Sequence, residues 1–218
     1  MKPSTDKYSI NQFGTIYCIG RNYARHVAEM KSEILDEPVV FLKPRTSVIF
    51  NEQSIIIPEI SKNVHHEVEM VLQIGKKTDN VSTVTALDSV KSIAVGLDIT
   101  ARDLQSEAKK AGLPWSLSKG FKTFAPVGNF VNYDKEIDLL NLDINVKVNG
   151  ETRQSGNTSM MLFSAAQIIS YLSYHFTLFP GDLIFTGTPE GVSQIHPGDL
   201  IEASLGNQLS VLKVYVQS

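Results

Sequence analysis

The sequence predicts an α+β fold that consists mainly of mixed and antiparallel sheets with few helices. Short apolar runs dominate the chain, and glycine, proline, asparagine and aspartate separate them, which is the pattern of a strand-rich protein. Three segments have helical features. No linker or low-complexity segment divides the chain, so we expect a single domain over residues 15–218, preceded by an N-terminal arm at residues 1–14.

Nine of the short apolar runs predict strands. They are 15–19, 39–43, 54–57, 66–74, 92–99, 143–148, 183–186, 200–204 and 209–216. The run 143–148 alternates and meets Asn149-Gly150, a strong signal for a hairpin turn. The sequence Pro-Gly-Asp-Leu-Ile occurs at 180–184 and again at 197–201, and each copy predicts a tight turn that leads into a strand.

The three helical segments are 23–31, 101–111 and 159–176. Gly112 and Pro114 follow the second segment and are typical helix stop signals. In the third and longest segment, apolar residues recur at a spacing of three and four, which predicts a stripe packed against the core.

Composition and charge exclude several classes of partner. The hydrophobic share of 42% and the charged share of 20% are ordinary for a soluble globular protein. A net charge of −3 without a basic block argues against nucleic acid. No apolar stretch approaches the roughly 18–20 residues of a membrane-spanning helix, and residues 1–11 lack the layout of a secretory signal. A single cysteine, Cys18, cannot form an internal disulfide, so we expect a cytoplasmic protein that binds no membrane.

Three carboxylates are candidates for a metal site. Glu67 and Glu69 project from the same face of a predicted strand, where they raise each other's pKa unless a positive charge lies between them. Asp98 interrupts an otherwise apolar strand, where an unpaired carboxylate is costly. If the three converge, they suit Mg²⁺ or Mn²⁺. Solvent-exposed glutamates, and an aspartate that caps the next segment, explain the same residues without a metal.

His26 and Glu29 are candidates for a general base. If residues 23–31 form a helix, these two side chains are three positions apart and can touch. A carboxylate bonded to one imidazole nitrogen leaves the other nitrogen free to accept a proton. An isolated pair of this kind is nevertheless more often a solvated helix face.

Several polar residues could bind an anion next to these groups. Arg102 and Gln105 follow Asp98 closely, and Lys119 precedes the apolar Phe121. A lysine in such a place can donate to a developing oxyanion, or it can simply reach the solvent. The glycine- and threonine-rich loop 186–192 offers backbone N–H groups and hydroxyls to a carboxylate, although an ordinary turn has the same composition.

Seven sequence blocks in a fixed order resemble the fumarylacetoacetate hydrolase family, and the likeness runs from residue 16 onward. The blocks are GRNYARHVAEM (20–30), EPVVFLKP (37–44), HHEVEMVLQIG (65–75), GLDITARDLQ (96–105), LPWSLSKGFKTFAPVG (113–128), VNGETRQ (148–154) and PGDLIFTGTPEGV (180–192). Within the family the chain is most similar to the short acylpyruvase type, which includes oxaloacetate-acting members. The resemblance implies a roll- or barrel-like form of the β-rich fold and a homodimer.

The resemblance also implies roles for ten residues of this chain. Glu67, Glu69 and Asp98 match the ligands of Mg²⁺ or Mn²⁺, and the catalytic pair matches His26 and Glu29 on a segment that acts as a lid in relatives. Lys119 matches the active-site lysine. The substrate-contacting positions match Arg21, Arg102, Gln105 and Thr188.

The function that we expect from the sequence is hydrolysis of the carbon–carbon bond of a small acylpyruvate, such as acetylpyruvate or fumarylpyruvate, through a pyruvate enolate. The same groups could decarboxylate oxaloacetate, interconvert its enol and keto forms, or isomerise 2-hydroxyhepta-2,4-diene-1,7-dioate. The His–Glu pair favours hydrolysis, because that reaction needs a base for its water. A non-catalytic protein that binds a metal and a dicarboxylate is the alternative from another class.

Overall fold

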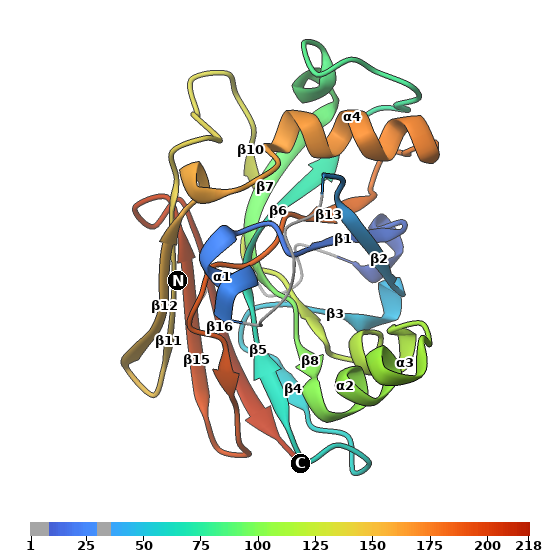
Figure 1. The fold of residues 1–218 in the computed structure, drawn as a ribbon. Coiled ribbons are helices and arrows are strands. Elements are labelled where there is room, and N and C mark those ends of the chain that lie inside the picture. Colours follow the sequence, from blue (N-terminus) through green and yellow to red (C-terminus); the bar gives the residue numbers. More distant parts are fainter. Residues whose placement is uncertain (1–8, 30–35) are drawn as a thin grey trace.

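The computed structural model describes residues 9–29 and 36–218, in which two large sheets lie face to face (Figure 1). The six-stranded sheet has the order β10-β7-β6-β13-β1-β2, and the five-stranded sheet has the order β12-β11-β15-β16-β4. A three-stranded sheet, β14-β5-β8, and the pair β3-β9 complete the strand pairing of this part of the chain. The mixed sheets with few helices that the sequence predicts are therefore confirmed.

The strands are β1 (Ile16–Gly20), β2 (Val39–Lys43), β3 (Val48–Ile49), β4 (Ser54–Ile56), β5 (Val64–His66), β6 (Val68–Ile74), β7 (Val90–Leu97), β8 (Thr100–Ala101), β9 (Ala125–Pro126), β10 (Val131–Asn132), β11 (Asp143–Val148), β12 (Glu151–Asn157), β13 (Leu183–Phe185), β14 (Ser193–Gln194), β15 (Leu200–Leu205) and β16 (Ser210–Gln217). The helices are α1 (Ala24–Glu29), α2 (Arg102–Ala111), α3 (Ser116–Lys119) and α4 (Ala165–His175). Short 3₁₀ turns are η1 (Ile10–Gln12), η2 (Arg45–Ser47), η3 (Ala86–Ser89) and η4 (Thr158–Met160).

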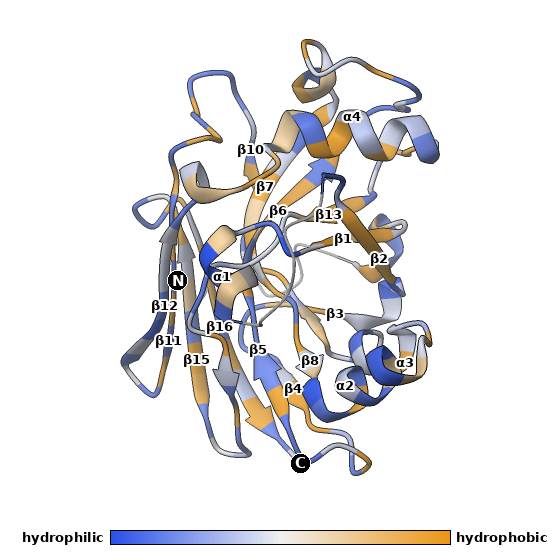
Figure 2. Cartoon of the chain, in the orientation of Figure 1, coloured by the Kyte–Doolittle hydropathy of each residue, from blue (hydrophilic) through white to orange (hydrophobic). Residues whose placement is uncertain are grey.

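Each face of the six-stranded sheet packs against its own hydrophobic cluster. On β6, Met70 and Leu72 join the larger cluster, which also takes the inner residues of the five-stranded sheet and the apolar stripe of α4. Val71, which points the other way, joins a smaller cluster with Cys18 and Phe185. Apolar side chains accordingly concentrate on the central strands and on one side of α4, whereas α2 is hydrophilic (Figure 2). Because both faces are covered, every polar side chain on β6 is buried and needs a partner.

The hairpin signal at Asn149-Gly150 is confirmed. β11 pairs with β12 in antiparallel register, and both turn residues have positive φ, 52° and 81°. The two Pro-Gly-Asp turns also form as expected, because Gly181 and Gly198 have φ of 94° and 96° and each turn leads directly into β13 or β15.

The strand expected at 66–74 is interrupted at Glu67. Residues before the break form β5, which pairs with β8 and β14, and residues after it form β6, which pairs with β7 and β13. Glu67 therefore lies where the chain passes from one sheet to another.

The helix expected at 159–176 is too long at its start. The helix α4 begins at Ala165, because Ser164 and Gln167 form a reciprocal capping box there. Before it, Met161 forms a bridge with Tyr23, and the backbone N–H of Leu162 donates to the carbonyl of Asn22. Backbone pairing to a distant segment thus replaced the first turns of the expected helix.

The helix expected at 23–31 is observed as α1, over Ala24–Glu29, and its last two expected residues lie outside the described part of the chain. The same holds for residues 1–8 of the expected N-terminal arm. In the described part of the chain, every helix is too short or too polar to cross a membrane.

Candidate metal centre and substrate pocket

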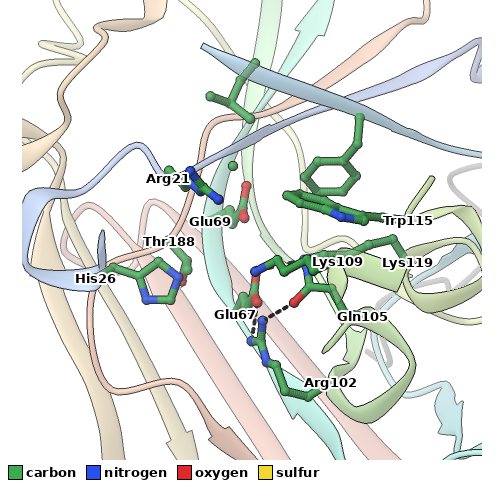
Figure 3. A pocket seen from close by; sticks show the side chains of 13 residues that line it. Arg21, His26, Glu67, Glu69, Arg102, Gln105, Lys109, Trp115, Lys119 and Thr188 are labelled. Carbon is green, nitrogen blue, oxygen red and sulfur yellow. Dashed lines mark hydrogen bonds and ion pairs between the residues drawn. The ribbon is translucent and has the colours of Figure 1, made fainter. Parts of the chain in front are cut away.

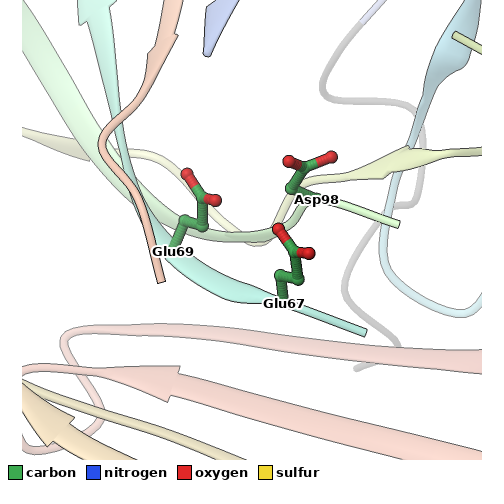
Figure 4. A group of neighbouring side chains, drawn as sticks. All are labelled: Glu67, Glu69 and Asp98. Atoms are coloured by element: carbon green, nitrogen blue, oxygen red, sulfur yellow. The ribbon is translucent and has the colours of Figure 1, made fainter. Parts of the chain in front are cut away.

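The carboxylates of Glu67, Glu69 and Asp98 meet at one point beneath a pocket (Figure 4). One oxygen from each lies within 4.8 Å of the others, and the three residues are 5%, 2% and 1% exposed. Glu67 comes from the break between β5 and β6, Glu69 from β6, and Asp98 from the end of β7. The strand pairing of β6 with β7 places Asp98 beside the two glutamates, whose alternation in the sequence predicted only that they share a face.

Two of the three carboxylates have strong cationic partners. The Lys119 ammonium lies 3.0 Å from Glu67 Oε2 and 2.5 Å from Asp98 Oδ2, and the Arg102 guanidinium pairs with Glu67 Oε1. Burial alone would raise the pKa of Glu67, but the charges of Lys119 and Arg102 outweigh it and hold that pKa well below its usual range. Burial likewise lowers the pKa of Lys119, and the charges of Asp98 and Glu67 more than reverse this. Both groups therefore stay ionised.

A second buried lysine, Lys43, holds Asp98 from the opposite side. Its ammonium is 2.7 Å from Asp98 Oδ1 and donates to the backbone carbonyls of Ile99, Lys119 and Phe124 at 3.0, 2.6 and 2.8 Å. Three carbonyls use all three N–H groups of an ammonium, so its attraction to Oδ1 is ionic and that oxygen accepts no hydrogen bond. The Lys43 side chain is completely buried, which makes it part of the core as well as of the site.

Glu69 differs from the other two carboxylates because it forms no ion pair with any described residue. Its Oε2 accepts a 2.7 Å hydrogen bond from the backbone N–H of Gly187. Burial, followed by the charges of Asp98 and Glu67, raises the pKa of Glu69 well above its usual range. A buried carboxylate that lacks a cation beside two others fits a divalent ion, because carboxylate oxygens are the ligands that Mg²⁺ and Mn²⁺ prefer.

Gly187 can approach Glu69 only because it is glycine. Its φ is 99°, and a Cβ at this position would lie 2.6 Å from the Cβ of Asn22. The side chain of Asn22 in turn donates to the carbonyls of Thr186 and Phe163 at 2.7 and 2.9 Å. These bonds fix the 186–188 loop against the segment that follows β1.

His26 and Glu29 are in contact, as their spacing predicted. His26 Nδ1 lies 3.2 Å from Glu29 Oε2, and His26 lines the same pocket as Glu67 and Glu69 (Figure 3). The backbone N–H of Gly191 also bonds to both Glu29 oxygens, at 3.2 and 3.3 Å. A proton on Nδ1, shared with Glu29, leaves Nε2 with a free lone pair. The arrangement can therefore act as a base toward a molecule in the pocket.

The remaining expected substrate residues surround the same pocket. The guanidinium of Arg102 donates to Gln105 Oε1 at 2.8 Å, which aligns the two side chains on one face of α2. Arg21, Lys119 and Thr188 also line the pocket. Of the ten residues that the resemblance marked, the pocket lining includes eight, and Glu29 and Asp98 contact it through His26 and Lys119.

A buried network that the sequence did not indicate fixes Thr188. Gln154 Nε2 donates to Thr188 Oγ1 at 2.8 Å and to the Pro189 carbonyl at 2.7 Å. Its Oε1 accepts from the Val68 backbone N–H at 3.0 Å and lies 2.9 Å from His66 Nδ1. Because the Thr188 oxygen accepts from Gln154, its O–H can donate into the pocket.

Sequence reasoning also missed Lys43, Lys109 and Trp115. Lys109 and Trp115 line the pocket, and the Lys109 ammonium is 5.2 Å from the centre of the Trp115 ring. A signal for Lys109 was available, because it lies seven residues after Arg102 and four after Gln105, on the same helix face. No local signal marked Lys43, since its partners lie 56 to 81 residues away.

A small-molecule pocket over converging acids and a histidine base is the arrangement of an enzyme, and comparison with known proteins identifies the family. Residues 15–217 match the profile "Fumarylacetoacetate (FAA) hydrolase C-terminal". The chain is 48% identical over 196 residues to oxaloacetate tautomerase FAHD1 of Mus musculus, covering 90% of this chain and 89% of the relative. The protein therefore belongs to the fumarylacetoacetate hydrolase family, as its sequence blocks suggested.

Solved structures agree with this assignment. Fumarylpyruvate hydrolase from Pseudomonas aeruginosa, in complex with Mn²⁺ and pyruvate, superposes with a TM-score of 0.90 at 36% identity, covering 94% of this chain and 90% of the other. The 2-hydroxyhepta-2,4-diene-1,7-dioate isomerase from Mycobacterium marinum superposes with a TM-score of 0.83 at 32% identity, covering 94% and 75%. Members of this fold thus act on several small organic acids.

Proposed function

We propose that the protein is a metal-dependent enzyme that interconverts the enol and keto forms of oxaloacetate. The observation that carries the proposal is the position of His26, paired with Glu29, in the same pocket as the buried carboxylates of Glu67 and Glu69. Tautomerisation removes one proton from carbon, so it needs one base and positively charged or hydrogen-bonding groups that stabilise the enolate. The 48% identity to a named oxaloacetate tautomerase supports this choice over the hydrolysis that the sequence favoured.

Glu67, Glu69 and Asp98 would hold Mg²⁺ or Mn²⁺, and the lack of a cationic partner at Glu69 among the described residues is what makes the set fit such an ion. The bound ion would supply Lewis acidity toward the 2-oxo acid end of the substrate. Gln154 Nε2 donates a hydrogen bond to Thr188 Oγ1, so the Thr188 O–H is free to donate to the carboxylate of the substrate next to the 2-oxo group. Arg102 and Gln105 close the side of the pocket that α2 forms.

His26 transfers the proton, and Lys119 stabilises the negative charge that develops on the substrate. In the keto-to-enol direction, Nε2 of His26 takes a proton from the carbon next to the 2-oxo group, while Glu29 holds Nδ1–H and stabilises the imidazolium. The enolate oxygen then takes a proton from solvent to give the enol, and the enol gives that proton back to solvent in the reverse reaction. Lys119 stays protonated between Asp98 and Glu67, so its positive charge favours the developing oxyanion. In the reverse direction, His26 returns the proton to the same carbon.

Hydrolysis of a carbon–carbon bond is a second candidate, and the His26–Glu29 contact is the observation that favours it. The same Nε2 could take a proton from water, which would then attack the distal carbonyl of an acylpyruvate. The likeness to fumarylpyruvate hydrolase at 36% identity supports this reading. It needs a positioned water in addition to the base, and so demands more of the pocket.

Turnover of oxaloacetate separates the two candidates. The decay of enol-oxaloacetate absorbance would be measured with Mg²⁺, with Mn²⁺ and with EDTA, alongside pyruvate release from acetylpyruvate and fumarylpyruvate. We expect metal-dependent tautomerisation above the spontaneous rate without pyruvate release. His26→Gln should lower kcat/KM by about 10²–10⁴-fold, the usual contribution of a general base.

Thermal unfolding tests the metal site independently of turnover. Saturating Mn²⁺ should raise the Tm of the unaltered protein and of His26→Gln, because the ion binds the folded state. Glu69→Gln should abolish that rise. Release of pyruvate would select hydrolysis instead, and the absence of any effect of metal on Tm would exclude both metal-dependent reactions.

A further inference from the structure

Two of the four cationic side chains that line the pocket have no carboxylate partner. Arg102 and Lys119 pair with Glu67 and Asp98, as described above. Arg21 and Lys109 form no ion pair or side-chain hydrogen bond with any residue of the described ranges, 9–29 and 36–218. The positive charge of the pocket is thus balanced at its floor and unbalanced at its rim.

Arg21 is held in place by its backbone. It follows β1 directly with a φ of 60°, in the left-handed region that residues with a Cβ rarely adopt. The bonds from the side chain of Asn22 to the chain at 163 and 186 fix this turn. Arg21 Nε is buried and has no hydrogen-bond partner. A buried donor without a partner, on a backbone fixed in an unusual conformation, indicates a side chain that is positioned to bind a ligand.

Lys109 reaches the same pocket from α2. Trp115, whose ring is 5.6 Å from that of Phe41, lies under the Lys109 ammonium and limits where it can go. Burial, followed by the charges of Arg102 and Arg21, lowers the pKa of Lys109, which shows how close the cations are to one another. In Figure 3, Arg21 and Lys109 enter the pocket from different elements. The carboxylates of Glu67 and Glu69 are buried, whereas Lys109 is exposed.

We propose that Arg21 and Lys109 form a rim subsite that binds the second carboxylate of a dicarboxylic 2-oxo acid. The subsite makes the protein select dianionic over monoanionic 2-oxo acids. This inference rests on the proposed function in one respect, namely that the 2-oxo acid end of the ligand occupies the floor of the pocket. A carboxylate at the far end of a short chain then lies next to the unpaired positive charges of Arg21 and Lys109, and Trp115 forms an apolar wall beside it.

Binding of two matched ligands tests the subsite without relying on turnover. 2-Oxoglutarate and 2-oxopentanoate have the same chain length and differ in whether the far end is a carboxylate or a methyl group. Their Kd values would be measured by calorimetry with saturating Mn²⁺, for the unaltered protein and for Lys109→Met and Arg21→Gln. We expect each substitution to raise the Kd of 2-oxoglutarate by about 10-fold or more, which corresponds to the loss of one charge-assisted hydrogen bond. The Kd of 2-oxopentanoate should change by less than about twofold.

Lys110→Met is the matched control, because Lys110 is an exposed lysine of the same helix that does not line the pocket. It should leave both Kd values unchanged. Equal losses for both ligands would show a structural effect, and an unaltered protein that binds 2-oxoglutarate no more tightly than 2-oxopentanoate would overturn the subsite. Lys109 is exposed, so Lys109→Met should fold even if Arg21→Gln does not.

The two proposals can fail separately. A selective loss of 2-oxoglutarate binding in a protein that does not convert oxaloacetate would support the subsite and exclude the tautomerase. If the protein converts oxaloacetate and the substitutions leave the ratio of the two Kd values unchanged, the tautomerase is supported and the subsite is excluded.

Discussion

The floor and the rim of the pocket are built in different ways. The floor, defined here as Glu67, Glu69, Asp98, Lys43 and Lys119, stands on or beside paired strands, and each of its residues is at most 5% exposed. The rim, defined as Arg21, α1, the 186–191 loop and α2, consists of short helices and turns. Changes at the floor should therefore affect folding and chemistry together, whereas changes at the rim should separate them.

The floor illustrates why buried charges come in sets. A single buried carboxylate costs several kcal/mol, and the attraction of a well-placed ammonium offsets that cost only when its other N–H groups are also satisfied. Lys43 meets this condition through three backbone carbonyls. Those carbonyls lie just before β8, at the end of α3 and just before β9. One ammonium therefore joins β2 to three segments of the chain.

Replacing Lys43 should have the largest effect on stability. Lys43→Met leaves Asp98 with less compensating charge and leaves three buried carbonyls without a donor. We expect the free energy of unfolding to fall by about 3–5 kcal/mol, the usual cost of breaking a buried ion pair from one side. Urea denaturation in EDTA measures this directly.

Lys91→Met is the control for that experiment, because Lys91 lies on β7 but is exposed. Its effect should stay within about 0.5 kcal/mol. If Lys43→Met were equally mild, the floor would owe its stability to packing alone, and the contrast with the rim would lose its electrostatic basis.

Gln154 connects the two regions, so its replacement should have an intermediate effect. Gln154→Ala removes the acceptor of the Val68 N–H on the floor strand β6 and the donor that fixes Thr188 in the rim loop. Leaving such buried groups without partners should cost about 2–3 kcal/mol in unfolding free energy. If Thr188 binds the substrate, KM should also rise more than kcat falls, because a positioning residue acts through the group that it holds.

Gln194→Ala provides the comparison, since Gln194 is exposed and donates one side-chain hydrogen bond, to the Lys62 carbonyl. It should change neither KM nor, by more than about 0.5 kcal/mol, the stability. Loss of stability in Gln154→Ala with KM unchanged would limit the network to a structural role.

The sequence predicted most of the floor because its pattern is local. The alternation of Glu67 and Glu69 in a strand was sufficient to place them on one side, and the apolar neighbours of Asp98 marked it as buried. The predicted start of the helix at residue 159 was wrong, although Ser164 and Gln167 match the capping-box pattern, because the apolar spacing continues before Ser164. Local spacing does not report which backbone pairs with a distant segment.

The parts that the sequence did not indicate depend on long-range contacts. Lys43 looks like the polar end of a strand, and only the position of the segments around residues 99, 119 and 124 buries it. Gln154 lies 34 residues from Thr188 and 86 from Val68. Lys109 is the exception, since its helical spacing from Arg102 was readable.

Asp103 should give the smallest effect, and one that depends on pH. It anchors the start of α2 to the loop before β5 by accepting from Ser61 Oγ and the Lys62 backbone N–H, both at 2.7 Å. Burial would raise the pKa of Asp103, but these bonds and one from the Leu104 N–H outweigh it and lower that pKa. Because the side chain is largely solvated, we expect Asp103→Asn to cost about 1 kcal/mol at pH 7.

The sign of the pH dependence follows from the direction of the shift. A carboxyl group whose pKa is lowered in the folded state stabilises that state above its unfolded pKa of about 3.9, and this stabilisation is lost as the pH falls through the folded pKa. The difference in unfolding free energy between the unaltered protein and Asp103→Asn should therefore shrink as the pH falls below about 4. Glu107→Gln, on an exposed position of the same helix, is the control and should change the unfolding free energy at pH 7 by less than about 0.5 kcal/mol. A constant difference at all pH values would mean that the amide fails to fit the loop, and that the charge of Asp103 does not hold this end of the rim in place.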